Sequence, residues 1–490
     1  MHDSQDKPKR HCWECLRRTL VCDFTWPTCN RCARSGVECP GYNETRPLRV
    51  KQFALKKAKS RGKKRTDRED RKLTDVNEKP TISILEPELK TDVHAMLDAV
   101  RYYNDYIYPL MARKREAGHN WNIYQITQEQ FQKGVTRPEY ARIGLVCMVL
   151  SHRRSQARSD SDAKALQRTA LKYRGQALLS LNGAIKERSK QNQSVLLAGI
   201  LTLLHVDQLQ QGFTSDCKIH LEGARIIITA CGGMSSLVES PGLMPLILDF
   251  VYLVVMADTS SPASQLLVGS LSIHELEYMI LKYGGIGYAF RMCPPPLLVE
   301  ILKINNLRMR SSKQRIRHNI LEGEAVALLR RLDVFSGEKW VAADDSIDKG
   351  ITLVASMYQA AVILYCMSSL QDLDVLQTSP ILQKNRRTAR DLVYELISRT
   401  RAAFGIAGCL VWPLMVLGVE AGDDDCTAMR EFIRRGLAEQ WIYSATYAPM
   451  ALKETLERYW ALGKSGWEAC FDRPSIFSAL IAVNCGGIPF

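Results

Sequence analysis

The pattern of hydrophobic and polar positions changes near residue 85 of this 490-residue chain. Beyond that point apolar side chains recur every three or four residues, which is the period of helices with one buried face. Runs of alternating β-branched residues are nearly absent, so the pattern predicts an all-α domain over 85–490. Helices are expected near 138–153, 160–188, 193–211, 215–231, 241–257, 272–283, 295–308, 315–333, 346–371, 382–404, 410–421, 425–438 and 447–463.

The first apolar stripe of this domain allows two interpretations. A heptad-like spacing of four and three residues, typical of a dimerising coiled coil, is formed by Leu89, Val93, Met96, Val100, Tyr103, Ile107 and Leu110. Leu97, Ala99 and Tyr106 widen the stripe beyond a coiled-coil seam, which favours a helix packed on a globular body. The packed helix is the favoured interpretation, and the coiled coil stays open.

Residues 1–84 show no such periodicity. After Pro40 and Gly41 the chain is first basic and then mixed in charge, so we expect a flexible basic linker over 46–84 behind an N-terminal module over 1–45. A short basic run could be a nuclear import signal, a set of phosphate contacts or a solvated charge run, and all three stay open. This run contains Arg61, Lys63, Lys64 and Arg65.

The formal net charge of +14 is concentrated at the N-terminal end. Residues 1–72 contain 20 Lys or Arg against 9 Asp or Glu, whereas the remaining residues contain 46 against 43. A basic end on a nearly neutral body indicates a polyanionic partner, and DNA, RNA and an acidic membrane all qualify.

Several features favour an intracellular protein without a membrane segment. No apolar core follows the first ten residues, so no secretory signal is expected. The longest uncharged apolar stretch, 351–367, is shorter than a bilayer span and is expected to be a buried helix. The nine cysteines outside the N-terminal cluster form no C-x2-C pair, so they are expected to be free thiols in a reducing compartment.

Six cysteines near the N-terminus form one spacing unit used twice, C-x2-C-x6-C. The candidate metal ligands are Cys12, Cys15, Cys22, Cys29, Cys32 and Cys39. Three thiolates leave a tetrahedral Zn²⁺ one ligand short, so six sulfurs complete two ions only if two of them bridge. By symmetry the bridges are Cys12 and Cys29. The predicted cofactor is therefore two Zn²⁺, one on Cys12, Cys15, Cys22 and Cys29 and the other on Cys29, Cys32, Cys39 and Cys12.

Other metal sites and enzyme classes explain these residues less well. A zinc ribbon built on the two C-x2-C pairs leaves Cys22 and Cys39 unexplained, and the H-x-E and P-C-x-x-C signatures of zinc deaminases are not matched. A metal-storage protein would need more clustered cysteines. The chain has no nucleophile elbow, Walker loop or HExxH, and Gly285 and Gly287 lack the third glycine of a phosphate loop. We therefore expect no enzymatic activity.

Residues 10–42, including Pro27 two residues before the fourth cysteine, resemble the fungal binuclear zinc-cluster transcription factors. Stretches such as RYYNDYIYPLM (101–111), HLEGARIIITACGG (220–233) and LVWPLMVLGVEA (410–421) resemble their helical fungal-specific regulatory domain, in the subgroup of acriflavine-sensitivity-control-type regulators. His220 in the second stretch is expected to be a packing residue.

The resemblance implies a nuclear, sequence-specific DNA-binding regulator of transcription by RNA polymerase II, controlling metabolic, biosynthetic or drug-response genes. Its implied partners are double-stranded DNA and, through the helical domain, the transcription machinery or co-regulators. A homodimer is one option.

The family also places a short helix after the second cysteine in the major groove, where basic side chains read a CGG-type triplet. The candidate DNA-binding residues are Lys9, Arg10, Arg17, Arg18, Arg31 and Arg34. His11 precedes the cluster and could also meet a phosphate. Family members commonly have basic residues where this chain has Leu16, Thr19 and Val21, so the preferred DNA site stays open and Arg18 is expected to carry most of the base readout.

Overall fold

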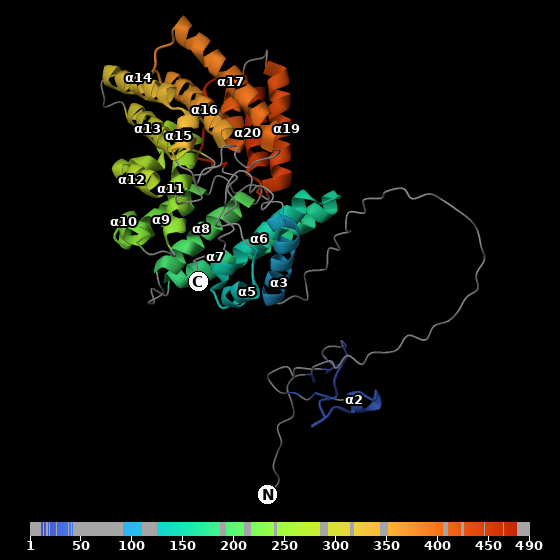
Figure 1. Cartoon of the computed structure of the whole chain (residues 1–490). Coiled ribbons are helices and arrows are strands. Elements are labelled where there is room, and N and C mark those ends of the chain that lie inside the picture. Colours follow the sequence, from blue (N-terminus) through green and yellow to red (C-terminus); the bar gives the residue numbers. More distant parts are fainter. Residues whose placement is uncertain are drawn as a thin grey trace, which may run out of the picture. The chain divides into compact units, whose positions relative to one another are not determined.

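A computed structural model of the chain divides into two compact units, Met1–Thr81 and Ile82–Phe490 (Figure 1). In the first unit the structure describes residues 11–12, 14–15, 18, 20–25, 27–37, 39–40 and 42. In the second unit it describes 92–109, 125–186, 193–209, 217–239, 243–284, 293–313, 318–343, 351–404, 410–422, 426–444, 446–463 and 465–477. The predicted linker 46–84 lies outside these residues, so the boundaries of the module and the linker stay predictions.

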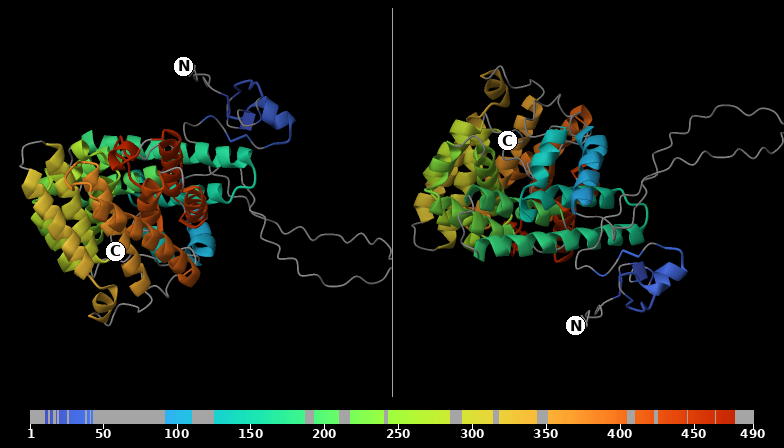
Figure 2. Two further views of the ribbon diagram at one scale, coloured as in Figure 1. Left: turned by 90° about the horizontal axis from the view of Figure 1, so that it is seen from above. Right: turned by 90° about the horizontal axis from the view of Figure 1, so that it is seen from below.

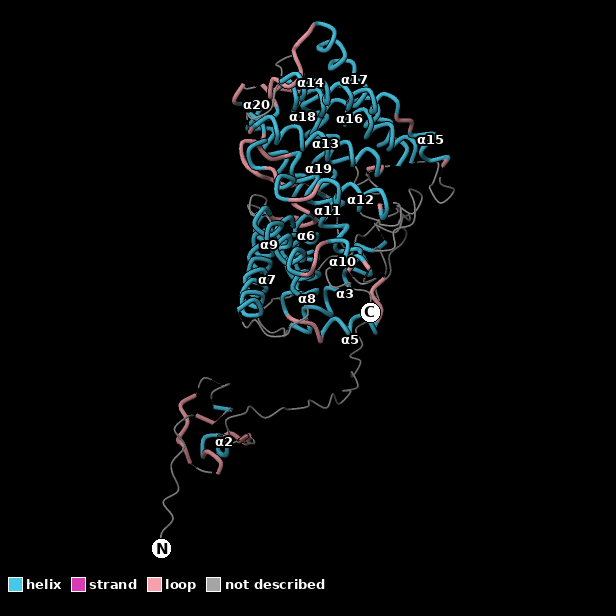
Figure 3. The backbone as a smooth tube through the Cα atoms, turned by 90° about the vertical axis from the view of Figure 1, so that its left-hand side faces the viewer, coloured by secondary structure: helices cyan, strands magenta, loops and turns pink. Residues whose placement is uncertain are grey.

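The second unit is helical, with no strand among the residues just given (Figure 3). Its main helices are α3 (Asp92–Tyr102), α5 (Gln128–Val135), α6 (Glu139–Ser155), α7 (Asp160–Lys186), α8 (Gln193–Leu209), α9 (Cys217–Ala230), α10 (Met234–Val238), α11 (Met244–Thr259), α12 (Ile273–Tyr283), α13 (Pro295–Ser312), α14 (His318–Val334), α15 (Gly337–Ala342), α16 (Ile351–Gln371), α17 (Pro380–Phe404), α18 (Val411–Glu420), α19 (Thr427–Ser444), α20 (Ala448–Ala461) and α21 (Trp467–Cys470). A π-helical turn, η2 (Tyr103–Ile107), and two 3-10 turns, η5 (Ala263–Gln265) and η6 (Leu267–Ser270), complete the set.

The predicted all-α domain is confirmed, and each longer predicted helix has a counterpart. The short helices α5, α10, α15 and α21 were missed, because four to eight residues are too few to show an amphipathic period. A local signal for α5 was present. The Thr127 hydroxyl accepts the backbone N–H of Gln130, whose side chain accepts the N–H of Thr127 in return, which is a capping box.

The helices pack in two groups around one continuous apolar core. In Figure 1, α3 to α9 lie in the lower part of this unit and α13 to α20 in the upper part. The central helix of the upper group is α16, which packs against α13, α14, α15, α17 and α18. Between the groups, α11 packs against α8, α9, α12 and α13. In both views of Figure 2, α7 runs along one edge of the unit, where it packs on α6.

The apolar stretch at 351–367 lies in helix α16 (Ile351–Gln371), within the bounds of the predicted helix 346–371. Helix α16 continues to Gln371, so it is long and apolar enough to cross a membrane by length and composition, and the prediction of a stretch too short to span was wrong. Ser368 and Ser369 extend it, since both are buried and hydrogen-bond within the domain. However, 72% of its most apolar window is buried inside the domain. Its role as a core helix accounts for this composition.

Helix α3 is packed on the globular body, as the favoured interpretation predicted. Met96, Val100, Tyr103 and Ile107 are buried in the core, and α3 packs against α6 and α5. Of the residues that widen the stripe, Ala99 is buried, whereas Tyr106 is 37% exposed.

Candidate metal centre and DNA-binding surface

Four cysteine sulfurs of the first unit lie within 4.8 Å of one another, from Cys12, Cys15, Cys29 and Cys32. The Cys12 and Cys15 sulfurs each lie 3.6 Å from the Cys29 sulfur, and 3.7 and 4.0 Å from the Cys32 sulfur. In a tetrahedral zinc site with bonds of about 2.3 Å, neighbouring sulfurs are about 3.8 Å apart. The spacing of these thiols therefore fits a metal ion.

The remaining two cysteines adjoin this group. The Cys22 sulfur lies within 4.8 Å of the Cys29 sulfur and of an Asp23 carboxylate oxygen. The Cys39 sulfur accepts the backbone N–H of Cys29 at 3.5 Å, and it also interacts with the Cys12 thiol. The structure thus gathers all six predicted ligands in one small core. It differs from the predicted grouping in one respect, because Cys15 and Cys32, assigned to different ions, lie in the same group of four.

Each C-x2-C unit folds in the same way. The Cys12 sulfur accepts the backbone N–H of Cys15 at 3.4 Å, and the Cys29 sulfur accepts that of Cys32 at 3.3 Å. At the second C-x2-C pair this contact caps helix α2 (Asn30–Arg34), since Cys29 is the N-cap residue of that helix. Local geometry therefore turns both sulfurs of each unit toward one point.

Three further side chains, which the sequence reasoning did not assign to this core, hold it together. The Nδ1 atom of His11 accepts the backbone N–H of Cys22 at 3.0 Å, and its ring packs on Phe24, a residue at a left-handed φ of 57°. The Tyr42 hydroxyl donates to the carbonyl of Thr25 at 2.8 Å and lies 3.6 Å from the Cys22 sulfur. The Nδ1 atom of His11 is thus occupied within the module and is not open to a phosphate.

Three of the candidate DNA-binding residues are described, and all three are exposed: Arg18, Arg31 and Arg34. The Arg31 guanidinium donates to the carbonyl of Val21 at 3.0 Å. The second C-x2-C-x6-C repeat therefore supports the segment around Val21 in the first repeat. Val21 itself is 70% exposed. The other candidates, Lys9, Arg10, Arg17 and the run Arg61, Lys63, Lys64 and Arg65, lie outside the described residues.

The sequence matches two family models. Residues 10–49 match the fungal Zn(2)-Cys(6) binuclear cluster domain, and residues 100–473 match the fungal specific transcription factor domain. The chain belongs to the fungal Zn(2)-Cys(6) transcription factors. It is a DNA-binding transcription regulator, in which a zinc-cluster domain precedes a helical transcription factor domain.

Two curated relatives support this membership. The chain is 31% identical over 488 residues to the phomenoic acid biosynthesis cluster-specific transcriptional regulator of Leptosphaeria maculans, covering 99% of this chain and 92% of that protein. It is 24% identical over 327 residues to the acriflavine sensitivity control protein acr-2 of Neurospora crassa, covering 60% of this chain and 50% of that protein. The resemblance to acriflavine-sensitivity-control-type regulators is thereby confirmed. No solved structure matches the chain.

Burial and hydrogen bonding shift the pKa values of the cluster thiols in this family member. Burial raises the pKa of Cys12 and Cys15, and it raises the pKa of Cys32 to about 12. Burial would also raise the pKa of Cys22, but hydrogen bonds from the backbone of Cys12 and Phe24 outweigh it and lower that pKa to about 7. Because zinc binds thiolates, metal uptake must expel protons from most of these groups.

In the helical domain of this transcription factor, His220 is a packing residue, as expected. Its Nε2 lies 2.8 Å from Asp207 Oδ2, and Arg174 Nε donates to the other oxygen of the same fully buried carboxylate. Asp207 therefore ties α7, α8 and α9 together. A second buried pair, His205 and Asp249, joins α8 to α11 at 2.7 Å. The phosphate-loop resemblance at Gly285 and Gly287 lies outside the described residues.

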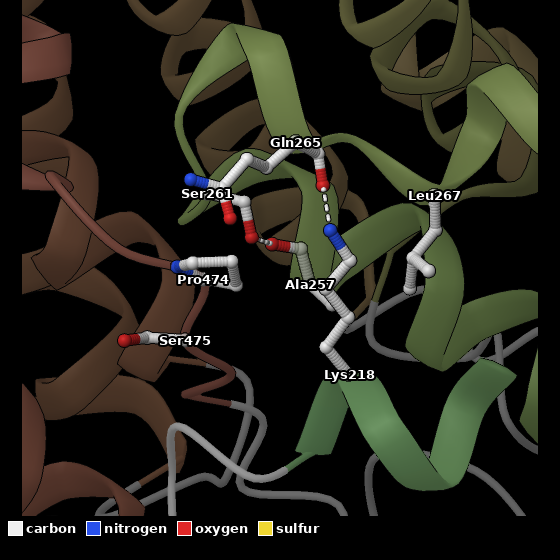
Figure 4. Close-up of a pocket in the computed structure, with 7 residues that line it drawn as sticks. All are labelled: Lys218, Ala257, Ser261, Gln265, Leu267, Pro474 and Ser475. Carbon is white, nitrogen blue, oxygen red and sulfur yellow. Dashed lines mark hydrogen bonds between the residues drawn. The ribbon is translucent and has the colours of Figure 1, made fainter.

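A pocket with a cavity volume of about 10 Å³ lies between α9, α11 and the turn η5 (Figure 4). It is lined by Lys218, Ala257, Ser261, Gln265, Leu267, Pro474 and Ser475. Figure 4 shows the Lys218 ammonium turned to the carbonyl of Gln265, to which it donates at 3.0 Å, while the Ser261 hydroxyl donates to the carbonyl of Ala257. The pocket is smaller than typical small-molecule sites, and these polar groups already have partners.

Proposed function

We propose that the six cysteines hold two Zn²⁺ ions and that Cys12 and Cys29 bridge them. Cys12 and Cys29 are fully buried. Cys29 belongs to both sulfur groups, and Cys12 interacts with the thiols of Cys29, Cys15 and Cys39. A soft, all-thiolate donor set suits zinc, and six sulfurs serve two tetrahedral ions only through shared ligands. When bound, zinc supplies the free energy that folds the module.

The zinc-cluster domain, over 1–45, binds double-stranded DNA through its basic side chains. The exposed Arg18 follows the second cysteine and reads a base edge in the major groove, with Arg17 beside it. Lys9, Arg10, Arg31 and Arg34 neutralise phosphates, which fixes the register of the module without carrying sequence information. Arg31 also supports the reading segment through its hydrogen bond to Val21.

The remaining segments act around this module. The linker 46–84 adds phosphate contacts, and its run at 61–65 directs the protein to the nucleus. The helical domain, over 85–490, contacts co-regulators or the transcription machinery. The gene set is a biosynthetic gene cluster, a proposal supported by the name of the Leptosphaeria relative, which spans nearly the whole chain.

The test is genome-wide mapping of bound sites combined with transcript profiling. We expect wild-type protein at promoters of clustered biosynthetic genes, with their transcripts changed when the protein is deleted. Cys29→Ser should abolish both effects, whereas Cys231→Ser, at a partly buried thiol outside the cluster, should leave both intact. Binding confined to scattered genes of primary metabolism, or occupancy that survives Cys29→Ser, would contradict the proposal.

A further inference from the structure

The last turn of α6 carries three consecutive basic residues whose hydrogen bonding is incomplete: His152, Arg153 and Arg154. Each has one buried nitrogen without a hydrogen-bond partner, namely His152 Nε2, Arg153 Nε and Arg154 Nη2. His152 is 3% exposed and Arg154 is 8% exposed. Polar atoms buried to this extent are usually paired, so each of these three calls for an explanation.

Arg154 is the clearest of the three. Its guanidinium carbon lies 4.9 Å from the centre of the Tyr447 ring, and no residue described in the structure offers it a carboxylate. The other arginine buried in the described part of this domain, Arg308, also has an unpaired Nε, but its two remaining nitrogens donate to four acceptors, including Glu468. Arg154 has no comparable set of acceptors among the described residues.

A second unpaired donor belongs to the same neighbourhood. The indole Nε1 of Trp441 in α19 is buried without a partner, and its ring packs edge-on against Tyr447 at 6.3 Å. Helices α6 and α19 pack against each other, and Gln156 donates to the carbonyl of Ile442 where they meet. The Tyr447 hydroxyl donates to Glu454, and the described residues show no ion pair between Glu454 and Arg154. Donors from two helices thus flank one aromatic ring, and neither Arg154 Nη2 nor Trp441 Nε1 has an acceptor in the described part of the chain.

The surroundings of Arg154 compensate only in part for the free-energy cost of burying its charge. The face of Tyr447 attracts a cation, and the C-terminal end of α6 carries a partial negative charge. Neither replaces a counter-ion, because a guanidinium keeps its charge when buried and buried charges are stable only when paired. Burial lowers the pKa of Arg154, which reflects the same missing partner.

We propose that a small oxyanion, a carboxylate or phosphate group, binds between α6 and α19 against Arg154 and Trp441. The unpaired Nη2 of the guanidinium offers a charged donor to such an oxyanion, and the indole N–H offers a second donor. The proposal does not depend on the zinc or DNA assignments, since all of its residues lie in the helical domain.

The probes are sodium phosphate and sodium acetate, each compared with sodium chloride at equal ionic strength. The thermal midpoint of the zinc-loaded full chain should rise saturably with at least one oxyanion, as expected when a ligand binds only the folded state. Arg154→Met should weaken that response about tenfold or more. Arg331→Met, at an exposed arginine paired with Glu300, should respond as wild type does.

The comparison between variants separates this site from the basic N-terminal module, which also attracts phosphate but is the same in every variant. If Arg154→Met does not fold, Trp441→Phe serves instead, because it removes one donor and keeps most of the packing. It should weaken oxyanion binding severalfold. An unchanged response in both variants would overturn the proposal. So would a wild-type protein that responds to neither oxyanion, because an acidic side chain of the chain itself would then be the partner of Arg154.

Discussion

The guanidinium of Arg308 in α13 donates to the carboxylate of Glu468 in α21 at 2.7 Å, although 160 residues separate them in the sequence. Glu468 also accepts the backbone N–H of Ala263, and its own N–H donates to Asp372. The neighbouring Trp467 is fully buried. The short helix α21 therefore holds the end of the described chain against the turn η5, helix α13 and Asp372, the residue that follows α16.

Removing the carboxylate of Glu468 should destabilise the helical domain strongly. We expect Glu468→Ala to lower the free energy of unfolding by about 3 kcal/mol, because it leaves the fully buried Arg308 without its counter-charge. Glu324→Ala removes the partner of a more exposed arginine, Arg310, and should cost about 1 kcal/mol or less. Urea unfolding of both variants measures the difference. If both variants lose the same free energy of unfolding, the ion pair of the buried Arg308 contributes no more than that of Arg310.

The bridging model makes a distinct prediction for each cysteine. The purified wild-type protein should contain two zinc ions per chain. Cys12→Ser and Cys29→Ser should lose most of both ions, because each variant removes a ligand from each ion, whereas Cys39→Ser should retain about one. Metal analysis by mass spectrometry measures these contents, with Cys231→Ser as the control. One zinc per wild-type chain, or equal losses in the three cluster variants, would rule out the bridges.

Protonation of His152 should contribute to acid unfolding of the helical domain. Burial lowers the pKa of His152 to about 4, below the usual 6.5, and its Nδ1 lies 3.0 Å from the Tyr102 hydroxyl beside the Arg153 guanidinium. A lowered pKa means that the folded state prefers the neutral ring. This preference stabilises the fold fully above pH 6.5 and is lost as the pH falls toward 4, by up to about 3 kcal/mol.

The matched variant is His152→Gln, which cannot titrate and can still pair with Tyr102. The free energy of unfolding should fall between pH 7 and 4.5 in both proteins, because carboxylates also titrate there, but it should fall less in the variant. Parallel curves for the two proteins would show that His152 is protonated without cost in the folded state.

Base readout should depend mainly on Arg18. A bidentate arginine–guanine contact discriminates against a wrong base by about 1–3 kcal/mol. Arg18→Ala should therefore nearly erase the preference between a selected site and a scrambled one, whereas Arg34→Ala should weaken binding to both alike. Thr19→Lys should move the selected site toward CGG. Selection from random oligonucleotides measures all three, and a CGG preference that survives Arg18→Ala would assign the readout to another residue.

The sequence alone determined the class of this protein, because the decisive signals are local. In a C-x2-C unit the backbone N–H of the second cysteine donates to the sulfur of the first, three residues earlier. The spacing alone therefore predicted that the thiols of Cys12 and Cys15 lie close together. The longer helices were equally readable, because each carries a periodic apolar face over three or more turns. Short elements such as α15 (Gly337–Ala342) have no such face.

Tertiary structure decided which distant polar groups share an environment. No local pattern places Glu468 against Arg308, lets Asp207 accept from both Arg174 and His220, or brings Trp441 beside the ring that covers Arg154. These contacts join different helices, and the one between Arg308 and Glu468 spans 160 residues of sequence. Their partners are fixed by how the apolar faces pack, and a periodic pattern specifies which face of a helix is buried but not which helix covers it.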